Sequence, residues 1–268
     1  MFNSLNLYEQ YSAAAYCPNN NDASNTQITC PAKNCPLVQS AKAMSTDEFE
    51  NTPDTDTTGF VAYDETNKVT VVSFRGSRSL ANFVTDVNFP LDNTDICTGC
   101  KVHRGFLQSW NEIRSNILAA AKSAADANKC SLVVTGHSLG AAIATLCAAE
   151  LRKAGYNVAL YTYGSPRVGN PAFANFVTAQ AGGNYRVTHT NDPVPHLPLS
   201  AMGFQHVGPE YYINTGNLLP VSASNVQMLQ GVNNILGNTA QIFTDIASHL
   251  WYFNGICNCG AGLDVSGL

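Results

Sequence analysis

The chain has 268 residues, of which 45% are hydrophobic and only 12% are charged, and its formal net charge is −5. This length suits one large α/β domain or two small ones with a sizeable core, and the absence of a basic block argues against nucleic acid as a partner. No apolar run reaches the roughly 18 residues needed to cross a bilayer, so no membrane-spanning segment is expected.

Hydrophobic periodicity predicts helices and strands that alternate along the chain. A helix is expected over residues 5–16, another should place Phe106, Trp110, Ile113 and Ile117 on one face, and a third should occupy residues 141–152. Strands are expected at residues 59–63, 69–75, 132–135, 158–163, 185–190 and 211–214. This alternation predicts an α/β fold with a mostly parallel central sheet and helices on both faces. No linker divides residues 1–268, so a single domain is expected.

The nine cysteines are many for a cytosolic protein. Two close pairs, Cys30 with Cys35 and Cys97 with Cys100, lie in polar segments rich in proline, asparagine and glycine, where small disulfide-closed loops fit. A zinc site is the competing interpretation, but no nearby cysteine or histidine pair completes a ligand set. We therefore expect disulfides, an extracellular location and at least one unpaired thiol, because nine is an odd number.

Residues 136–140 read Gly-His-Ser-Leu-Gly and match the pattern G-x-S-x-G. A short apolar strand pattern precedes them and a helix-forming stretch follows, so Ser138 lies where a strand turns sharply into a helix. The flanking glycines are needed because a side chain at either position would crowd this turn. The context favours Ser138 as a catalytic nucleophile over a serine that only caps a core helix.

A serine hydroxyl needs a general base, and the base needs a carboxylate to orient it. In folds with this elbow the acid follows the serine and the histidine follows the acid. Asp192 is the favoured acid because it closes a predicted strand, whereas Glu150 lies inside the helix and Asp264 follows every histidine. His206 and His249 both remain candidates for the base, with His249 modestly favoured by its late position before LWYF.

The oxyanion formed by serine attack on a carbonyl needs hydrogen-bond donors that already point at it. One donor comes with the elbow, the backbone N–H of Leu139. The other should come from the loop after residues 69–75, where Ser77 offers both an N–H and a hydroxyl. The alternative for Ser77 is an ordinary turn residue.

Several long motifs follow one another in the chain: FRGSRS at 74–79, CTGC at 97–100, GHSLGAA at 136–142, YGSPRVGN at 163–170, THTNDPVPHLP at 188–198 and HLWYF at 249–253. Together they resemble the secreted fungal class 3 lipases of the Thermomyces and Rhizomucor type. The resemblance implies an α/β-hydrolase fold, oxyanion donors at Ser77 and Leu139, and no metal or organic cofactor. It also implies a triad of Ser138, Asp192 and His249, since the histidine that opens HLWYF is the catalytic base of that family.

The same resemblance implies a disulfide framework. Cys30 pairs with Cys35, Cys97 pairs with Cys100, and Cys17 pairs with the C-terminal tail. This chain has two cysteines in the tail, Cys257 and Cys259, where the family usually has one, and we expect Cys259 to be the partner.

The segment after Ser77 bears on the kind of ester that is cleaved. Leu80, Phe83, Val84 and Val87 are spaced to form an apolar stripe on a helix. An ordinary surface helix packed on the core has the same pattern. The functional hypothesis is a lid over residues 79–88 that hides the site in water and turns its apolar face to lipid.

The resemblance thus implies a secreted triacylglycerol lipase that hydrolyses carboxylic esters of acylglycerols through an acyl-enzyme. Such a protein would work as a peripheral, monomeric enzyme at a lipid–water interface. Two alternatives stay open: a feruloyl-type or short-chain soluble carboxylesterase on the same fold, and a catalytically inactive lipid-binding relative.

Overall fold

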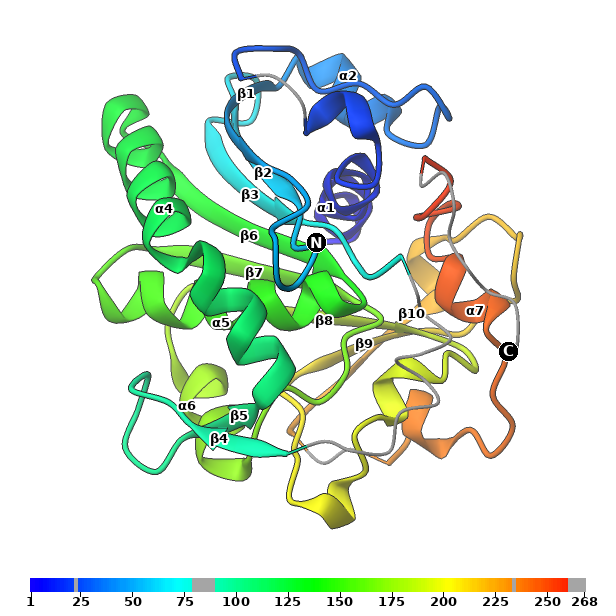
Figure 1. The fold of residues 1–268 in the computed structure, drawn as a ribbon. Helices are drawn as coiled ribbons and strands as arrows, with labels where there is room; N and C mark the ends of the chain where they lie inside the picture. Colours follow the sequence, from blue (N-terminus) through cyan, green and yellow to red (C-terminus); the bar gives the residue numbers. More distant parts are fainter. Residues whose placement is uncertain (22–23, 79–89, 233–234, 260–268) are drawn as a thin grey trace.

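The computed structural model describes residues 1–21, 24–78, 90–232 and 235–259. At its centre lies an eight-stranded sheet with the strand order β1-β2-β3-β6-β7-β8-β9-β10 (Figure 1). These strands are β1 (Met44–Phe49), β2 (Gly59–Asp64), β3 (Val69–Phe74), β6 (Ser131–His137), β7 (Val158–Tyr163), β8 (Asn184–His189), β9 (Glu210–Ile213) and β10 (Val226–Leu229). Two short strands, β4 (Leu91–Asn93) and β5 (Lys101–His103), form a separate antiparallel pair.

The middle of the sheet is parallel and its edges are antiparallel. Strands β3, β6, β7, β8 and β9 run parallel, while β1, β2 and β10 pair antiparallel with their neighbours. All six residues of β3 are buried, as expected for a strand that is covered on both faces. The prediction of a mostly parallel sheet is therefore confirmed.

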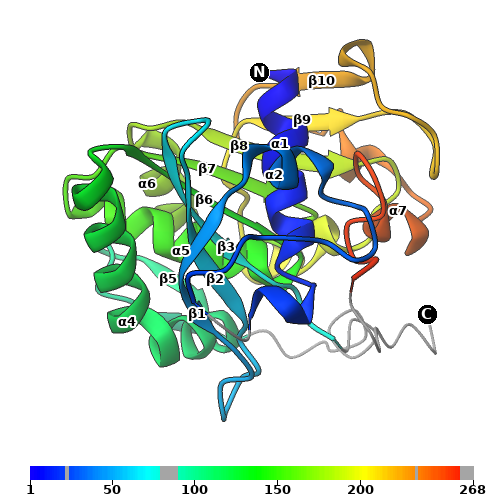
Figure 2. The ribbon, with the colours of Figure 1, turned by 90° about the horizontal axis from the view of Figure 1, so that it is seen from above.

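Helices cover both faces of this sheet (Figures 1 and 2). They are α1 (Phe2–Ala14), α2 (Pro36–Ala41), α4 (Arg104–Asn128), α5 (Leu139–Lys153), α6 (Pro171–Ala179) and α7 (Ala247–Leu250), with single-turn 3₁₀ helices at Pro18–Asn20, Val194–His196, Ser200–Met202, Ala223–Asn225 and Asn238–Ala240. Residues of α4, α5 and α6 form one apolar core with one face of the sheet. Residues of α1 and α2 form a second core with the other face, together with Tyr252 and Ile256 near the C-terminus.

Helix α5 is the most deeply buried helix of the described structure. Its sequence, LGAAIATLCAAELRK, is rich in alanine, and nearly all of it is buried between α4 and the sheet. Small side chains allow a helix to approach its neighbours closely without strained rotamers. The helix that follows Ser138 is thereby held in a fixed place, and so is the turn from which it starts. None of the described helices is long and apolar enough to span a membrane.

Candidate active site

The turn between β6 and α5 holds Ser138 in a conformation that serine rarely adopts. Strand β6 ends at His137, α5 begins at Leu139, and Ser138 between them has φ 57° and ψ −126°. Such a backbone is unfavourable for a residue with a Cβ, and strain of this kind is typical of functional sites. The N–H of Ser138 donates to the carbonyl oxygen of Tyr163 at 3.0 Å, which fixes the turn against the end of β7.

Two glycines leave the room that this arrangement needs. A Cβ on Gly140 would lie 2.7 Å from the carbonyl oxygen of Arg75, so only glycine lets α5 pass the end of β3. A Cβ on Gly164 would lie 2.8 Å from Oδ2 of Asp192 and from Nδ1 of His249. Gly164 directly follows Tyr163, whose carbonyl oxygen accepts the hydrogen bond from the N–H of Ser138. The elbow and the Asp192–His249 pair therefore lie next to each other.

Asp192 and His249 form a fully buried, hydrogen-bonded pair. Nδ1 of His249 lies 2.9 Å and 2.8 Å from the two carboxylate oxygens of Asp192, although 57 residues separate the two in sequence. Asp192 follows β8, and His249 lies on α7. A carboxylate in this position fixes the imidazole tautomer that leaves Nε2 able to accept a proton. Among the described residues, Nε2 of His249 has no hydrogen-bond partner.

Tyr252 is a further partner of Asp192, and no sequence pattern predicts this role for it. Its hydroxyl donates to Oδ2 of Asp192 at 2.6 Å, and the N–H of Val194 donates to Oδ1 at 2.8 Å. Burial, together with the nearby charge of Asp192, raises the pKa of Tyr252 well above its usual value of 10, so the hydroxyl keeps its proton. The only signal in the sequence was its place in HLWYF, three residues after His249.

The other candidate acids and bases have structural partners. His206 is buried, its Nε2 lies 2.8 Å from the carbonyl oxygen of Pro195, and burial lowers its pKa well below 6.5. Glu150 accepts hydrogen bonds from Trp110 and Arg114 of helix α4, both at 2.8 Å. Asp264 lies outside the described residues. The structure therefore brings His249, and not His206, to Asp192.

The predicted oxyanion donors lie on the two segments that meet at the elbow. Leu139 is the first residue of α5. A Cβ on Gly76 would lie 3.0 Å from Cβ of Ser138, so the loop that carries Ser77 runs beside the elbow. The predicted lid, residues 79–88 with Leu80, Phe83, Val84 and Val87, lies outside the described residues.

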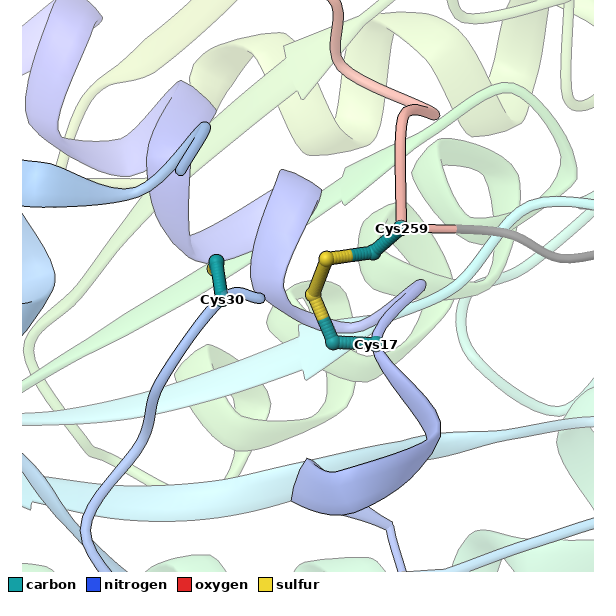
Figure 3. A group of neighbouring side chains, drawn as sticks. All are labelled: Cys17, Cys30 and Cys259. Carbon is teal, nitrogen blue, oxygen red and sulfur yellow. A yellow bond between two sulfur atoms is a disulfide. The ribbon is translucent and has the colours of Figure 1, made fainter. Parts of the chain in front are cut away.

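The structure contains the expected cysteine pairs. Disulfides join Cys17 to Cys259 (Figure 3), Cys30 to Cys35 and Cys97 to Cys100. The three free cysteines of the described structure are Cys130, Cys147 and Cys257. The sulfurs of Cys17, Cys30 and Cys259 lie within 4.8 Å of one another, but each of them belongs to a disulfide and is not a thiolate that could bind a metal.

Family models match two parts of the chain. Residues 71–202 match the model "Lipase (class 3)", and residues 1–45 match the model "Lipase 3 N-terminal region". The first match includes Ser77, Ser138 and Asp192, and the second covers α1 and α2.

Individual relatives extend the similarity over nearly the whole chain. The chain is 45% identical to the secreted mono- and diacylglycerol lipase 1 of Fusarium solani, over 94% of this chain and 76% of that protein. A crystal structure of a mutant MDLA from Penicillium cyclopium superposes with a TM-score of 0.92 at 41% identity and covers 97% of each chain. A solved structure described as "a serine protease triad forms the catalytic centre of a triacylglycerol lipase" has a TM-score of 0.83 at 32% identity and covers 96% of each chain.

These matches confirm the expectation of a secreted lipase with an α/β-hydrolase fold. The chain belongs to the class 3 lipases and is a carboxylic ester hydrolase.

Proposed function

We propose that Ser138, His249 and Asp192 hydrolyse carboxylic esters of acylglycerols through an acyl-enzyme. The observation that carries this proposal is the buried bond between Nδ1 of His249 and the Asp192 carboxylate, beside a serine with φ 57° at a strand–helix elbow. This combination provides a nucleophile, a base and a group that orients the base.

The reaction has two halves that use the same residues. In the first, Oγ of Ser138 bonds to the ester carbonyl carbon while its proton passes to Nε2 of His249, and the N–H of Leu139 and the donors of Ser77 bind the oxyanion. Collapse of this intermediate breaks the bond to the glycerol oxygen, which takes the proton from His249. In the second half a water molecule gives a proton to His249 and attacks the acyl carbon. The bond from that carbon to Oγ of Ser138 then breaks, His249 returns the proton to Oγ, and the fatty acid is released.

Asp192 supports this proton transfer because its charge stabilises the imidazolium that forms in each half-reaction. The hydrogen bonds from Tyr252 and Val194 keep the carboxylate in place. Asp192→Asn should therefore lower kcat by about 10⁴-fold, since the amide would hold the wrong imidazole tautomer.

The proposed substrates are acylglycerols, with triacylglycerol and diacylglycerol as the two classes to compare. The relatives in the 44–45% range are named mono- and diacylglycerol lipases, whereas a more distant structural neighbour is described as a triacylglycerol lipase. Soluble aromatic esters are the substrates of the competing esterase hypothesis.

We further propose that residues 79–88 form a lid and that the enzyme acts at a lipid–water interface as a monomer. The apolar stripe of Leu80, Phe83, Val84 and Val87 supports the lid, because such a stripe is unfavourable in water and loses little against lipid. Large exposed apolar side chains support lipid contact: Leu218 in the connection between β9 and β10 is 76% exposed, and Ile242 and Phe243 in the segment before α7 are 89% and 82% exposed.

Hydrolysis of triolein emulsion, diolein emulsion, tributyrin and methyl ferulate, measured side by side, tests the substrate class. We expect turnover of the emulsions and little turnover of methyl ferulate. The paired variants His249→Ala and His206→Ala test the base, and only the first should abolish activity in a folded protein. Fast cleavage of methyl ferulate with none of the emulsions would overturn the lipase proposal.

The lid is tested by activity on tributyrin below and above its solubility limit. Activity should rise steeply once droplets form, and Phe83→Ser with Val84→Ser should flatten that rise while turnover of dissolved ester survives. Thr85→Ser, on the polar side of the same segment, is the matched control. A smooth saturation curve through the solubility limit would contradict the lid.

A further inference from the structure

His137, which directly precedes Ser138, makes contacts that extend the candidate active site. It is buried at the end of β6, and its ring lies 4.4 Å from the ring of His249 between centroids. Its Nε2 lies 2.9 Å from the main-chain carbonyl oxygen of His249. A carbonyl oxygen can only accept, so Nε2 of His137 carries a proton and donates.

The other ring nitrogen of His137 has a partner of its own. The hydroxyl of Tyr16 lies 2.7 Å from Nδ1, and the sulfur of Cys257 lies 3.6 Å from the same atom. Burial, followed by the proximity of His249, lowers the pKa of His137 well below 6.5, so the ring is neutral and Nδ1 accepts. Tyr16 therefore donates to Nδ1, which favours the tautomer with its proton on Nε2.

The backbone around His249 needs this support because α7 has only four residues, Ala247–Leu250. The last carbonyl groups of a helix lack partners within the helix. In α7 the carbonyl oxygen of Ser248 lies 3.0 Å from Nδ1 of His189, and that of His249 lies 2.9 Å from Nε2 of His137. His189 at the end of β8 and His137 at the end of β6 thus contact the successive carbonyl groups of Ser248 and His249.

We propose that His137 is a positioning residue for His249, with Tyr16 fixing the tautomer that makes this possible. The inference rests on the proposed function, since it assigns His249 the role of the base. His137 itself takes no part in proton transfer. A displacement of about 1 Å in a reacting group can lower a rate by about a hundredfold, so a single hydrogen bond to the backbone of His249 can have a large effect on kcat.

Three substitutions of His137 separate a positioning role from a packing role. His137→Gln keeps an N–H donor near the place of Nε2, His137→Asn keeps a polar group only near Nδ1, and His137→Phe keeps a flat ring. We expect the glutamine variant to retain the most activity on dissolved p-nitrophenyl butyrate. The asparagine and phenylalanine variants should lose about tenfold to a hundredfold in kcat, with little change in KM.

Tyr16→Phe tests whether Tyr16 fixes the tautomer of His137, and Tyr11→Phe is its matched control. Tyr11 is also a buried tyrosine of the N-terminal segment, but its hydroxyl donates to Asp64 at 2.8 Å, away from His137. Tyr16→Phe should lower kcat by about three- to tenfold, the effect of one lost hydrogen bond, and Tyr11→Phe should leave it unchanged. Phosphonate titration of active sites in each variant corrects every rate for the fraction of folded enzyme.

Several results would overturn the proposal. If His137→Phe kept the most activity, the ring would act by packing. If His137→Gln removed activity as completely as His249→Gln, then His137 would take part in proton transfer. If the wild type hydrolysed no ester and took up no phosphonate, the proposed function itself would fail. Equal rates in all His137 variants of an active enzyme would refute only the positioning role.

Discussion

Glu9 carries a buried carboxyl group that contacts Asn254, near the C-terminal end of the described structure. Its Oε2 accepts a hydrogen bond from Nδ2 of Asn254 at 2.9 Å, across 245 residues of sequence, and among the described residues its Oε1 has no partner. Burial raises its pKa well above 4.5, because the charged form loses its hydration. The folded protein therefore holds a proton on Glu9 at a pH where the unfolded chain has released it.

This difference predicts how Glu9→Gln changes stability with pH. A raised folded pKa gives stability that is fully present below about 4.5 and is lost as the pH rises toward the folded pKa. Glutamine does not titrate, so the variant does not lose this stability as the pH rises. The change in the free energy of unfolding caused by Glu9→Gln should therefore be more favourable at pH 8 than at pH 4, by about 1 kcal/mol or more. Urea unfolding at both pH values measures the difference, and Glu65→Gln at an exposed position is the control. An equal effect of Glu9→Gln at both pH values would contradict this account.

The residues of the candidate site differ in how far the sequence could predict them. Ser138 was predicted from local context alone, because the strand, the glycines and the helix that define an elbow are contiguous. Asp192 was predicted from the end of a strand, whereas His249 was only modestly favoured over His206 until the resemblance of HLWYF was used. Tyr16 could not be predicted, because its bond to His137 spans 121 residues and depends on how α1 packs across the sheet.

Among the secondary-structure elements, the buried strands were predicted well and the edge strands were missed. Strand β7 has the predicted bounds, Val158–Tyr163, and its neighbours differ by a few residues. Strand β10 (Val226–Leu229) was not predicted because two of its four residues are exposed, so it lacks the apolar pattern of an interior strand. Helix α6 was also missed, although Asn170 followed by Pro171 is a helix-start signal, and the Asn170 side chain accepts from the N–H of Phe173 at 3.1 Å.

The disulfides predict unequal contributions to stability from different elements. Cys17–Cys259 links the end of the N-terminal helical segment to the C-terminal tail across 242 residues, while Cys97–Cys100 spans three. In the loop-entropy model the long link contributes about 5 kcal/mol at most and the short one about 2 kcal/mol. Replacing each pair by alanine and measuring urea unfolding should therefore show the larger loss for Cys17–Cys259. A larger loss for Cys97–Cys100 would contradict the model, and non-reducing peptide mapping checks the pairing first.

For the molecule as a whole, we propose that residues 1–268 fold as a single domain. One eight-stranded sheet runs through the described structure, and the N-terminal helix and the C-terminal segment share one apolar core. Thermal unfolding should therefore give one cooperative transition, with equal calorimetric and van't Hoff enthalpies. Two separated transitions would contradict the proposal.

The buried histidines predict that the molecule becomes less stable in acid. Burial lowers the pKa values of His137 and His206 well below 6.5. Below about pH 6.5 these two histidines therefore bind protons in the unfolded chain but stay neutral in the folded chain. Each of these histidines lowers the free energy of unfolding by about 1.4 kcal/mol per pH unit as the pH falls through this range. Glu9 has an effect of the same size and opposite sign down to about pH 4.5, so it cancels the effect of one histidine. The free energy of unfolding should fall as the pH drops from 6.5 to 5, and His206→Gln should reduce the slope. A free energy that stays constant over this range would contradict the prediction.

The central claim is that Ser138 at the elbow accepts the acyl group, with His249 as the general base and Asp192 as the group that orients it. The most direct measurement is to inactivate the enzyme with an alkyl phosphonate ester and to locate the label by peptide mass spectrometry. The account predicts one phosphonate per molecule, on Ser138, with loss of ester hydrolysis in step with labelling and no labelling of Ser138→Ala. A label on any other residue, or full activity in the labelled protein, would contradict it.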